Sequence, residues 1–453
     1  MNTYQHYFKD KKVTVVRIGL LGRGVGDTAF MAELGAEVLV VDDASQEDMQ
    51  PSVDALKEYD NVRFKFGPYD LNDFVDADMV LVGAGMPYEH AVLVAAKEAG
   101  VPLKQSAALF AELSGIPIIG VTGTRGKSTT TSMIHHVLSQ ATGEEVLLGG
   151  NIRGVSNLQL LKDVHEDSIA VMELDSWQLQ GWGWADMSPQ IAVFTNFMED
   201  HLNYYQKDGE SKEQGMERYF TDKAQIFLHQ EESGVLITTP EVFERARTVA
   251  GSLGQEVVLA DSSVLPEDCL LAMPGEHNRL NAALAYEALK ATSLPDDIIF
   301  EGLASFPGVE GRLQYLREVD FVRYYNDNNA TTPQATIAAL TALDVGNKNI
   351  VLIAGGAYKA VNPAPLVEAI KKHCKQTILI PGTGTDRLLS ELEKIRDTIP
   401  NLVVENLAQA FEEARLVAEN GDIVLFSPGF ASFGQYKNEY ERNDEFVQLV
   451  SDI

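Results

Sequence analysis

The stretch from Gly120 to Thr131 limits the possible folds of this chain more than any other segment. It follows a short apolar run, residues 116–121, that predicts a buried strand, and it precedes residues 132–138, which have helical spacing. A glycine-rich turn between a strand and a helix is the setting of a phosphate-binding loop, because backbone amides at a helix N-terminus point toward an anion. The stretch therefore predicts a phosphate site.

Six residues of this loop are candidate cofactor-binding residues: Gly123, Thr124, Gly126, Lys127, Ser128 and Thr129. The glycines let the backbone approach an anion, Lys127 supplies a positive charge, and a hydroxyl of Ser128 or Thr129 can reach a magnesium ion. The usual loop has four residues between its glycines, whereas five residues separate Gly120 from Gly126 here. An ordinary glycine-rich turn is the alternative interpretation.

A second nucleotide site is predicted near the N-terminus, where residues 12–43 have the pattern of a strand, a helix and a second strand. Gly22 and Gly24 lie in the first turn, and Asp42 and Asp43 end the second strand, where a ribose or base contact is expected. The glycine spacing does not fit the dinucleotide pattern. Binding of another nucleotide is the interpretation we favour, with NAD binding or a purely structural turn as alternatives.

Polar residues follow several of the other predicted strands. Glu173 closes a buried strand downstream of the phosphate loop, which is where a magnesium-holding carboxylate belongs, although a solvated acid would fit as well. His201 follows the strand 190–196 between carboxylates and is a candidate metal or phosphate contact. Asn151 could bind a ligand or cap a turn, and Lys223 by itself predicts only a surface charge.

Two asparagines, Asn278 and Asn281, fall on neighbouring turns of one helix face, which suits recognition of an adenine edge. Capping or solvent exposure would explain the same spacing. Lys359 lies just past the predicted strand 349–356 and would present a cation to a carboxylate.

The length of 453 residues predicts two to four domains. The net charge, 36 − 66 = −30, argues against a general surface for nucleic acid or anionic membrane. Cys269 and Cys374 have no metal-site spacing, which indicates buried thiols in a reducing compartment. No apolar run approaches the roughly 20 residues of a membrane span, and residues 1–10 lack the core of a signal peptide, so we expect a soluble cytoplasmic protein.

Several segments together resemble the Mur ligase family of ATP-dependent enzymes that form amide bonds. The matching segments are Gly123–Thr130, Glu173–Leu179, Thr195–Leu202, Gly275–Asn281, Gly311–Arg312, Tyr325–Thr331, Gly355–Lys359 and Ser427–Phe433. Their order and spacing cover nearly the whole chain. The resemblance implies an α/β protein of three domains: a Rossmann-like UDP-sugar-binding domain (1–113), a central P-loop ATPase-like domain (114–306) and a Rossmann-like amino-acid-binding domain (307–453).

The resemblance also implies roles for individual residues, with ATP and Mg²⁺ as cofactors. Lys127 and Ser128 hold phosphate and magnesium, Glu173 and His201 are magnesium ligands, and Lys223 matches a carbamylated lysine that bridges to a second magnesium. Lys127, Lys223 and His201 are thus the implied catalytic residues. The remaining implied contacts are Asn278, Asn281, Arg312 and Asp327 to the nucleotide, Asn151 to the muramoyl-alanine end, and Thr331, Lys359 and Ser432 to the incoming amino acid.

Within the family, residues 427–442 are most similar to members that add D-glutamate to UDP-N-acetylmuramoyl-L-alanine in peptidoglycan synthesis. The implied partners are therefore these two small molecules, without nucleic acid or membrane, and we expect a monomer. Three positions depart from the family pattern: Glu310-Gly311 replaces Pro-His, Asn329 replaces a lysine and Glu439 replaces an aromatic residue. Asn329 and Glu439 bear directly on recognition of the amino acid's carboxylates. The alternatives are addition of L-glutamate or another amino acid, or an NTP-binding subunit that partners a glutaminase.

Overall fold

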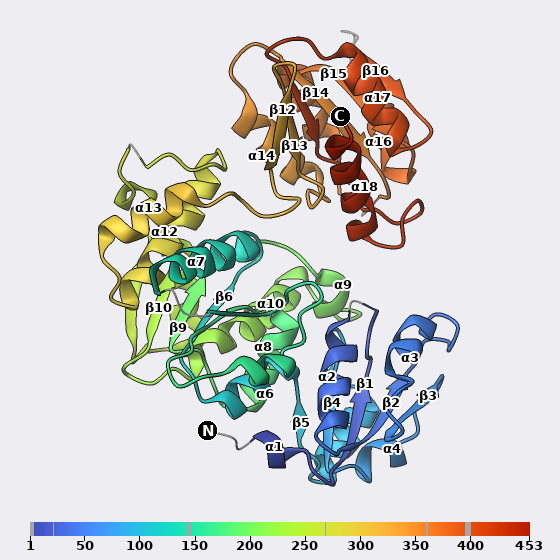
Figure 1. Cartoon of the computed structure of the whole chain (residues 1–453), viewed down its shortest axis with the longest axis vertical. Helices are drawn as coiled ribbons and strands as arrows, with labels where there is room; N and C mark the ends of the chain where they lie inside the picture. The colour runs from blue at the N-terminus through green and yellow to red at the C-terminus, as the bar shows by residue number, and fades with distance from the viewer. Residues whose placement is uncertain (1–3, 21, 143–145, 268, 359–360, 395–399) are drawn as a thin grey trace. The chain divides into compact units, whose positions relative to one another are not determined.

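Three sheets follow one another along the chain in the computed structural model (Figure 1). The structure describes residues 4–20, 22–142, 146–267, 269–358, 361–394 and 400–453. By its internal contacts the chain divides into two compact units, residues 1–264 with 281–302 and residues 265–280 with 303–453. The first unit holds the first two sheets and the second unit holds the third. The predicted α/β class is confirmed.

The first sheet is parallel throughout and has the strand order β3-β2-β1-β4-β5. Its strands are β1 (Lys12–Val16), β2 (Glu37–Asp42), β3 (Val62–Phe66), β4 (Met79–Val82) and β5 (Leu103–Lys104). The helices of this region are α1 (Tyr4–Tyr7), α2 (Arg23–Glu33), α3 (Gln50–Leu56), α4 (Asn72–Val75), α5 (Ala91–Glu98) and α6 (Ser106–Ser114). The central strands read as continuous apolar runs because helices cover both faces.

The second sheet is also parallel, with the order β11-β10-β9-β6-β8-β7. Its strands are β6 (Ile118–Thr122), β7 (Leu147–Gly150), β8 (Ala170–Glu173), β9 (Ile191–Phe194), β10 (Val235–Thr238) and β11 (Glu256–Leu259). Its helices are α7 (Lys127–Thr142), α8 (Ser176–Trp184), α9 (Leu202–Tyr205), α10 (Lys212–Leu228), α11 (Pro240–Ala250), α12 (Glu276–Ala291) and α13 (Asp296–Ser305), with 3-10 turns η1 (Gln159–Asp163) and η2 (Ser262–Val264). Strand β6 lies between β9 and β8, so the loops that follow these three strands meet at one edge.

The two sheets of the first unit share one apolar core. A buried carboxylate, Asp27, adds hydrogen bonds between the two parts of this unit. Asp27 on α2 accepts hydrogen bonds from Ser156 Oγ at 2.6 Å and from the Leu158 amide at 3.0 Å. Burial raises the pKa of Asp27, because the charged form loses its hydration. The two hydrogen bonds oppose that rise, and they tie the first sheet's helix to the segment that enters η1.

The third sheet has the order β12-β13-β17-β14-β15-β16. Its strands are β12 (Gln314–Val319), β13 (Val322–Asn326), β14 (Ile350–Gly355), β15 (Cys374–Ile380), β16 (Asn401–Val403) and β17 (Ile423–Phe426), and its helices are α14 (Pro333–Leu343), α15 (Ala364–His373), α16 (Thr383–Leu392), α17 (Leu407–Val417) and α18 (Glu439–Ser451). Leu352 packs in the cluster on one face and its neighbours Val351 and Ile353 in the cluster on the other, as the pleat of a strand requires.

The third sheet is mixed, since β12 pairs antiparallel with β13 because only a tight turn connects them. Helix α10 begins at Lys212, where Ser211 and Gln214 form a capping box. Both cysteines are buried, as expected.

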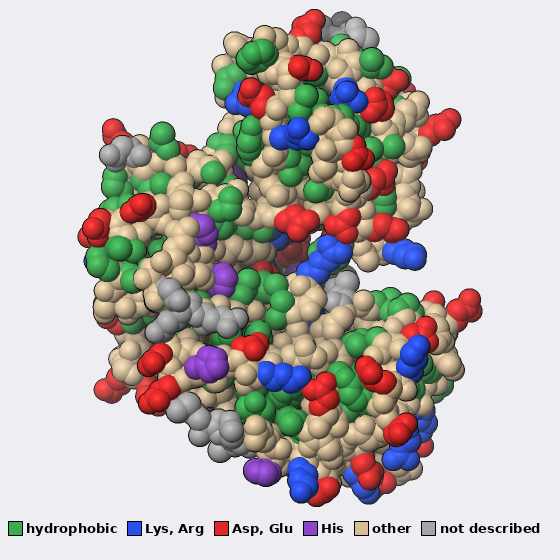
Figure 2. Space-filling model, in the orientation of Figure 1, with side chains coloured by type: hydrophobic (Ala, Val, Ile, Leu, Met, Phe, Trp, Pro, Cys, Tyr) green, Lys and Arg blue, Asp and Glu red, His purple; other side chains and the backbone are tan. Residues whose placement is uncertain are grey.

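Charged side chains of both signs are interspersed on the visible face of the molecule, with many acidic groups, as the net charge of −30 requires (Figure 2). Within the described ranges, each helix is too short or too polar to cross a lipid bilayer.

Candidate active site

The phosphate loop follows β6 and leads directly into α7, which begins at Lys127. Gly123 has a φ of 146°, and a Cβ there would stand 1.9 Å from Thr195 Oγ1. Gly126 has a φ of 82°, and a Cβ there would stand 2.3 Å from Asn281 Oδ1. Both positions therefore exclude a side chain, for conformational as well as steric reasons. Backbone amides at such a helix N-terminus are placed to bind an anion.

The segment after β9 braces this loop. The Arg125 amide donates to Asn196 Oδ1 at 2.9 Å, and Asn196 Nδ2 donates back to the Arg125 carbonyl at 3.1 Å. The Thr124 amide donates to the Asn196 carbonyl at 3.0 Å, and the Met198 amide donates to Thr124 Oγ1 at 3.0 Å. Sequence reasoning did not identify Asn196 as a bracing residue, although it lay in a segment that resembles the family.

Two lysines converge on one backbone carbonyl. Lys127 Nζ donates to the Gly123 oxygen at 3.1 Å, and Lys223 Nζ donates to the same oxygen at 2.8 Å. Lys223 lies on α10 and is only 1% exposed, so the prediction of a surface charge is wrong. Burial, and then repulsion by Lys127, lower the pKa of Lys223 well below its usual value. A neutral buried amine is the form of lysine that reacts with electrophiles.

Glu173 ends β8 and is buried, with 4% exposure. Asn151 Nδ2 donates to Glu173 Oε1 at 3.4 Å, and Arg23, at the start of α2, donates in turn to Asn151 Oδ1. This chain of contacts connects the first glycine loop to the phosphate site. Arg23 was missed because a single arginine between two glycines has no distinguishing pattern.

His201 lies just before α9 and has a φ of 52°. Its ring contacts Trp177, with centroids 4.8 Å apart, and Tyr219, with centroids 5.8 Å apart. Partial burial lowers the pKa of His201, Asp200 opposes that shift, and Lys223 and Lys127 add to it. The ring is therefore neutral at physiological pH, which is the form that binds a metal.

The residues at this edge suit Mg²⁺ held partly by phosphate. Among the residues that the structure describes, no three His, Cys, Asp or Glu side chains form a ready-made metal cluster. Mg²⁺ in nucleotide enzymes characteristically takes one or two protein ligands and completes its shell with phosphate oxygens and water. The Ser128 hydroxyl, Glu173 and His201 are three candidate ligands at this edge, from which one or two would hold Mg²⁺ beside the phosphates, and the loop glycines would let the backbone approach those phosphates.

The residues predicted to bind the first substrate lie at the carboxyl ends of two adjacent strands. Gly22 is the N-cap of α2 with a φ of 84°, and Gly24 lies in the first turn of that helix. Asp42 ends β2 and accepts from the Ala44 amide at 3.1 Å, and burial raises its pKa. Asp43 pairs with Arg17 at 3.1 Å, a partner that sequence reasoning missed.

The adenine candidates share α12. Asn281 lies against the phosphate loop at Gly126, within the first unit. Asn278 belongs to the second unit by its contacts, and its side-chain Nδ2 donates to the Pro274 carbonyl at 3.0 Å.

In the second unit, Asp327 follows β13 and accepts from Ser427 Oγ at 2.7 Å and from the Leu313 amide at 2.9 Å. Leu313 directly follows Arg312, the other predicted nucleotide contact of this unit. The charge of Arg312 opposes the rise that burial causes in the pKa of Asp327. Thr331 closes the same loop, where its amide donates to the Asn329 carbonyl at 3.0 Å. Ser432 follows β17 and is 5% exposed, and Lys359 lies outside the described residues.

A buried arginine that the sequence did not single out joins the two loops that carry Thr331 and Ser432. Arg442 on α18 is 0% exposed and donates to Asn328 Oδ1 at 2.8 Å, to the Asn328 carbonyl at 3.0 Å and to the Phe430 carbonyl at 3.3 Å. Burial lowers the pKa of Arg442 to about 10, so the side chain stays charged at neutral pH.

The ionisation of Asp327 gives a stability prediction. Burial raises its pKa to about 7, whereas an unfolded aspartate titrates near 3.9. Between these values the folded chain holds a proton that the unfolded chain has lost, so this contribution to stability is present at low pH and is lost as pH rises through 7. We expect the free energy of unfolding of the wild type, relative to Asp327→Asn, to fall by about 2–3 kcal/mol between about pH 5 and pH 8. Urea denaturation at both pH values checks this, and a constant difference would contradict it.

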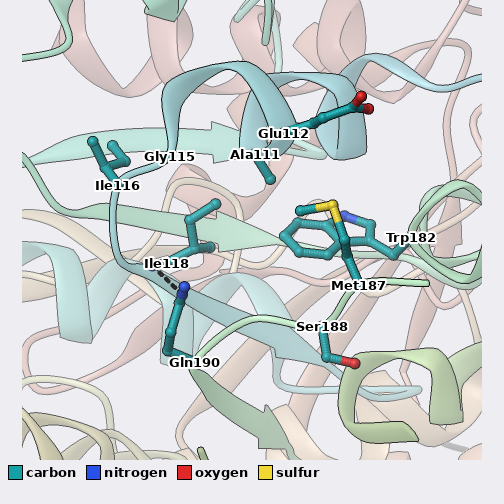
Figure 3. A pocket seen from close by; sticks show the side chains of 9 residues that line it. All are labelled: Ala111, Glu112, Gly115, Ile116, Ile118, Trp182, Met187, Ser188 and Gln190. Atoms are coloured by element: carbon teal, nitrogen blue, oxygen red, sulfur yellow. Dashed lines mark hydrogen bonds between the residues drawn. The ribbon is translucent and has the colours of Figure 1, made fainter. Parts of the chain in front are cut away.

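One further cavity, of about 280 Å³, lies away from this site (Figure 3). Ile118 and Gln190 line it near the amino ends of β6 and β9, together with Trp182 and Met187. The phosphate loop follows the opposite, carboxyl end of β6. Because ligands of open α/β sheets bind beyond the carboxyl ends of the strands, this cavity is not part of the active site.

Matches to known domains cover most of the chain. Residues 11–105 match the MurD-like N-terminal domain of Mur ligases, residues 121–248 the Mur ligase middle domain, and residues 311–430 the glutamate ligase domain of Mur ligases.

Similar proteins agree with these matches. A UDP-N-acetylmuramoylalanine–D-glutamate ligase of Roseiflexus sp. is 34% identical, over 97% of this chain and 98% of that protein. An enzyme of the same name from Lactococcus lactis is 33% identical, over 98% of each chain. The solved structure of UDP-N-acetylmuramate-alanine ligase from Thermotoga maritima has a similar fold, with a TM-score of 0.60 at 19% identity, over 98% of this chain and 99% of that one. With relatives of this identity along its whole length, the chain belongs to the Mur ligase family.

Proposed function

We propose that this protein is an ATP-dependent ligase that adds D-glutamate to UDP-N-acetylmuramoyl-L-alanine during peptidoglycan precursor synthesis. The observation that carries the proposal is the convergence of Lys127 and Lys223 on the Gly123 carbonyl at the edge that also holds Glu173. Relatives at 34% and 33% identity that are named as D-glutamate ligases support this choice of substrates. We place the reaction in the cytoplasm and propose that one copy of the chain carries the whole site.

The reaction proceeds by transfer of the γ-phosphoryl group of ATP to the terminal carboxylate of the L-alanine residue. The amine of D-glutamate then attacks the acyl phosphate carbon, the amide C–N bond forms, the C–O bond to phosphate breaks, and phosphate leaves while the attacking nitrogen gives up a proton. Lys127 and the amides of the Gly123–Ser128 loop stabilise the charge on the transferring group, while the braced loop holds it in line with the carboxylate. Bound Mg²⁺ neutralises charge on the phosphate oxygens.

Residues of the first unit supply the other components of this proposal. Glu173 and His201 would hold magnesium. A carbamate on Lys223 would be an anion that attracts the metal, whereas the protonated amine would be a cation that repels it. The low pKa of Lys223 favours this change, because only the neutral amine adds to carbon dioxide. Gly22, Gly24, Asp42 and Asp43 bind the UDP end of the substrate, and Asn151 lies between that loop and Glu173.

The second unit would bind the incoming amino acid and part of the nucleotide. Arg312 and Asp327 contact ATP, together with Asn278 on α12. Thr331, Lys359 and Ser432 receive the amino acid, and Arg442 holds the loops of Thr331 and Ser432 together.

Phosphate release tests the function. We expect ATP hydrolysis to require UDP-N-acetylmuramoyl-L-alanine and D-glutamate together, and L-glutamate to give at most a small fraction of that rate. Release with L-glutamate or a different amino acid instead would show that Asn329 and Glu439 have changed the specificity. An absence of release with all amino acids tried would contradict ligase activity and favour an NTP-binding subunit.

A further inference from the structure

Strand β1 lies at the centre of the first sheet, where the order of the strands reverses. Strands β2 and β3 follow on one side of β1, and strands β4 and β5 lie on the other. In an open parallel sheet a ligand binds beyond the carboxyl ends of the strands at such a point, because the loops on its two sides run in opposite directions and leave a crevice. The crevice of the first sheet is therefore expected between the ends of β1 and β4.

Arg17 directly follows β1 and stands at this crevice. Its amide donates to the carbonyl of Val41, near the end of β2, at 3.1 Å. On the other side, a Cβ added to Gly83, the residue after β4, would stand 2.1 Å from the Arg17 carbonyl oxygen. The backbone of Arg17 is thus held between the ends of the two neighbouring strands.

The backbone of Arg17 has a φ of 58°, a conformation that glycine adopts readily but that costs free energy in a residue with a side chain. Strained residues of this kind persist where the surrounding structure fixes them, and they cluster at ligand sites. Glycine would suit the backbone better at this position, so the arginine side chain is the feature that needs an explanation.

The Arg17 side chain joins the two sides of the crevice. Nη2 donates to Asp43 Oδ2 at 3.1 Å, just past β2, and Nη1 donates to the Gly85 carbonyl at 3.0 Å, just past β4. The next carbonyl, that of Met86, accepts from the hydroxyl of Tyr204 on α9 at 3.4 Å. The side chain of Arg17 is 34% exposed and that of Asp43 is 51% exposed, so a ligand in the crevice can reach both.

The chemistry of a nucleoside diphosphate explains why a cation would be placed here. A carboxylate such as Asp43 accepts hydrogen bonds from ribose hydroxyls and from the N–H group of uracil, but its charge repels a neighbouring diphosphate. A guanidinium that donates to the carboxylate offsets this repulsion and holds the carboxylate in one orientation.

We propose that Arg17 is a positioning residue for the UDP end of the substrate. It fixes the Asp43 carboxylate toward the nucleotide and offsets its charge, with the Gly85 carbonyl as the second anchor of the guanidinium. The inference rests on the proposed function, in which Asp43 binds this end of the substrate. It gives a role to a residue that the sequence presents only as an arginine after an apolar strand.

Calorimetric binding of UDP and steady-state phosphate release test the inference in the wild type, Arg17→Gln, Asp43→Asn and the double variant. We expect Arg17→Gln to weaken UDP binding and to raise the KM for the UDP-linked substrate about fivefold, the size of a charge-assisted contact at a partly exposed site. The Michaelis constants of ATP and D-glutamate, and kcat, should stay nearly unchanged. In the double variant the loss should be smaller than the product of the two single losses, because Arg17 acts through Asp43.

Arg17→Gly separates a role in binding from a role in folding. Glycine relieves the positive φ, so its melting temperature should equal or exceed that of Arg17→Gln, while UDP binding should be as weak as in Arg17→Gln. Arg63→Gln is the matched control. Arg63 lies on β3 of the same sheet and pairs with Glu37 at 3.7 Å, near the amino ends of β2 and β3 and away from the crevice. This variant should bind UDP like the wild type.

Unchanged UDP binding in Arg17→Gln, an equal rise of all three Michaelis constants, or fully multiplicative losses in the double variant would overturn the inference, while an active wild type still supported the ligase. A wild type that releases no phosphate with every amino acid tried would instead overturn the proposed function, and the inference with it.

Discussion

Replacement of Lys223 by alanine should reduce phosphate release by about 10²–10³-fold, the cost of removing one group that stabilises the transferring phosphoryl. The side chain is buried between α10 and the phosphate loop, where its amine donates to Gly123 and lies near Lys127. Neutral alanine leaves no group at this position that can become an anion, so magnesium would lose a ligand. The loss should appear in kcat more than in the KM of either substrate.

Short carboxylates such as acetate or formate should restore part of the activity of Lys223→Ala, because they can occupy the space of a carbamate. Lys212→Ala is the matched control: Lys212 lies on the same helix but is exposed and pairs with Glu199, so its loss should have little effect. Full activity of Lys223→Ala, or a partial loss that no carboxylate reverses, would exclude the carbamate.

Lys127→Met should cause a loss of similar size, about 10²–10³-fold in kcat. Methionine keeps most of the apolar stem of lysine but removes the charge that we assign to the β- and γ-phosphates. The loop itself should keep its shape, because Asn196 and Thr195 brace it from the segment after β9. We therefore expect an unchanged melting temperature together with weak ATP binding, measured by calorimetry.

Lys104→Met is the control for Lys127→Met, because it makes the same substitution away from the phosphate loop. Lys104 belongs to β5 of the first sheet and pairs with Glu112 at 2.5 Å. Glu112 lines the cavity of Figure 3, which lies at the amino ends of β6 and β9, away from the phosphate loop. The same substitution there should leave catalysis intact. If Lys127→Met bound ATP and turned over like Lys104→Met, the phosphate site would have to lie elsewhere.

The local structure of the site could be predicted from the sequence. A short apolar run, closely spaced glycines and a Gly-Lys-Ser start of a helix determine a strand, a turn and a helix within about fifteen residues, so periodicity and backbone conformation were sufficient. Glu173 and Asp42 were correctly expected at strand ends, because an acid that follows a buried apolar run marks where that run leaves the core.

Burial and convergence were decided by the tertiary structure alone. Lys223 reads as a surface residue on a polar helix, and only the packing of α10 against the end of β6 brings its amine to the Gly123 carbonyl and lowers its pKa. The contact from Arg23 to Asn151 joins residues 128 positions apart, and the contact from Arg442 to Phe430 joins residues 12 positions apart. Sequence patterns record the period of one element, whereas such contacts depend on which strands are neighbours in a sheet, and that order is set by the crossovers of the whole chain.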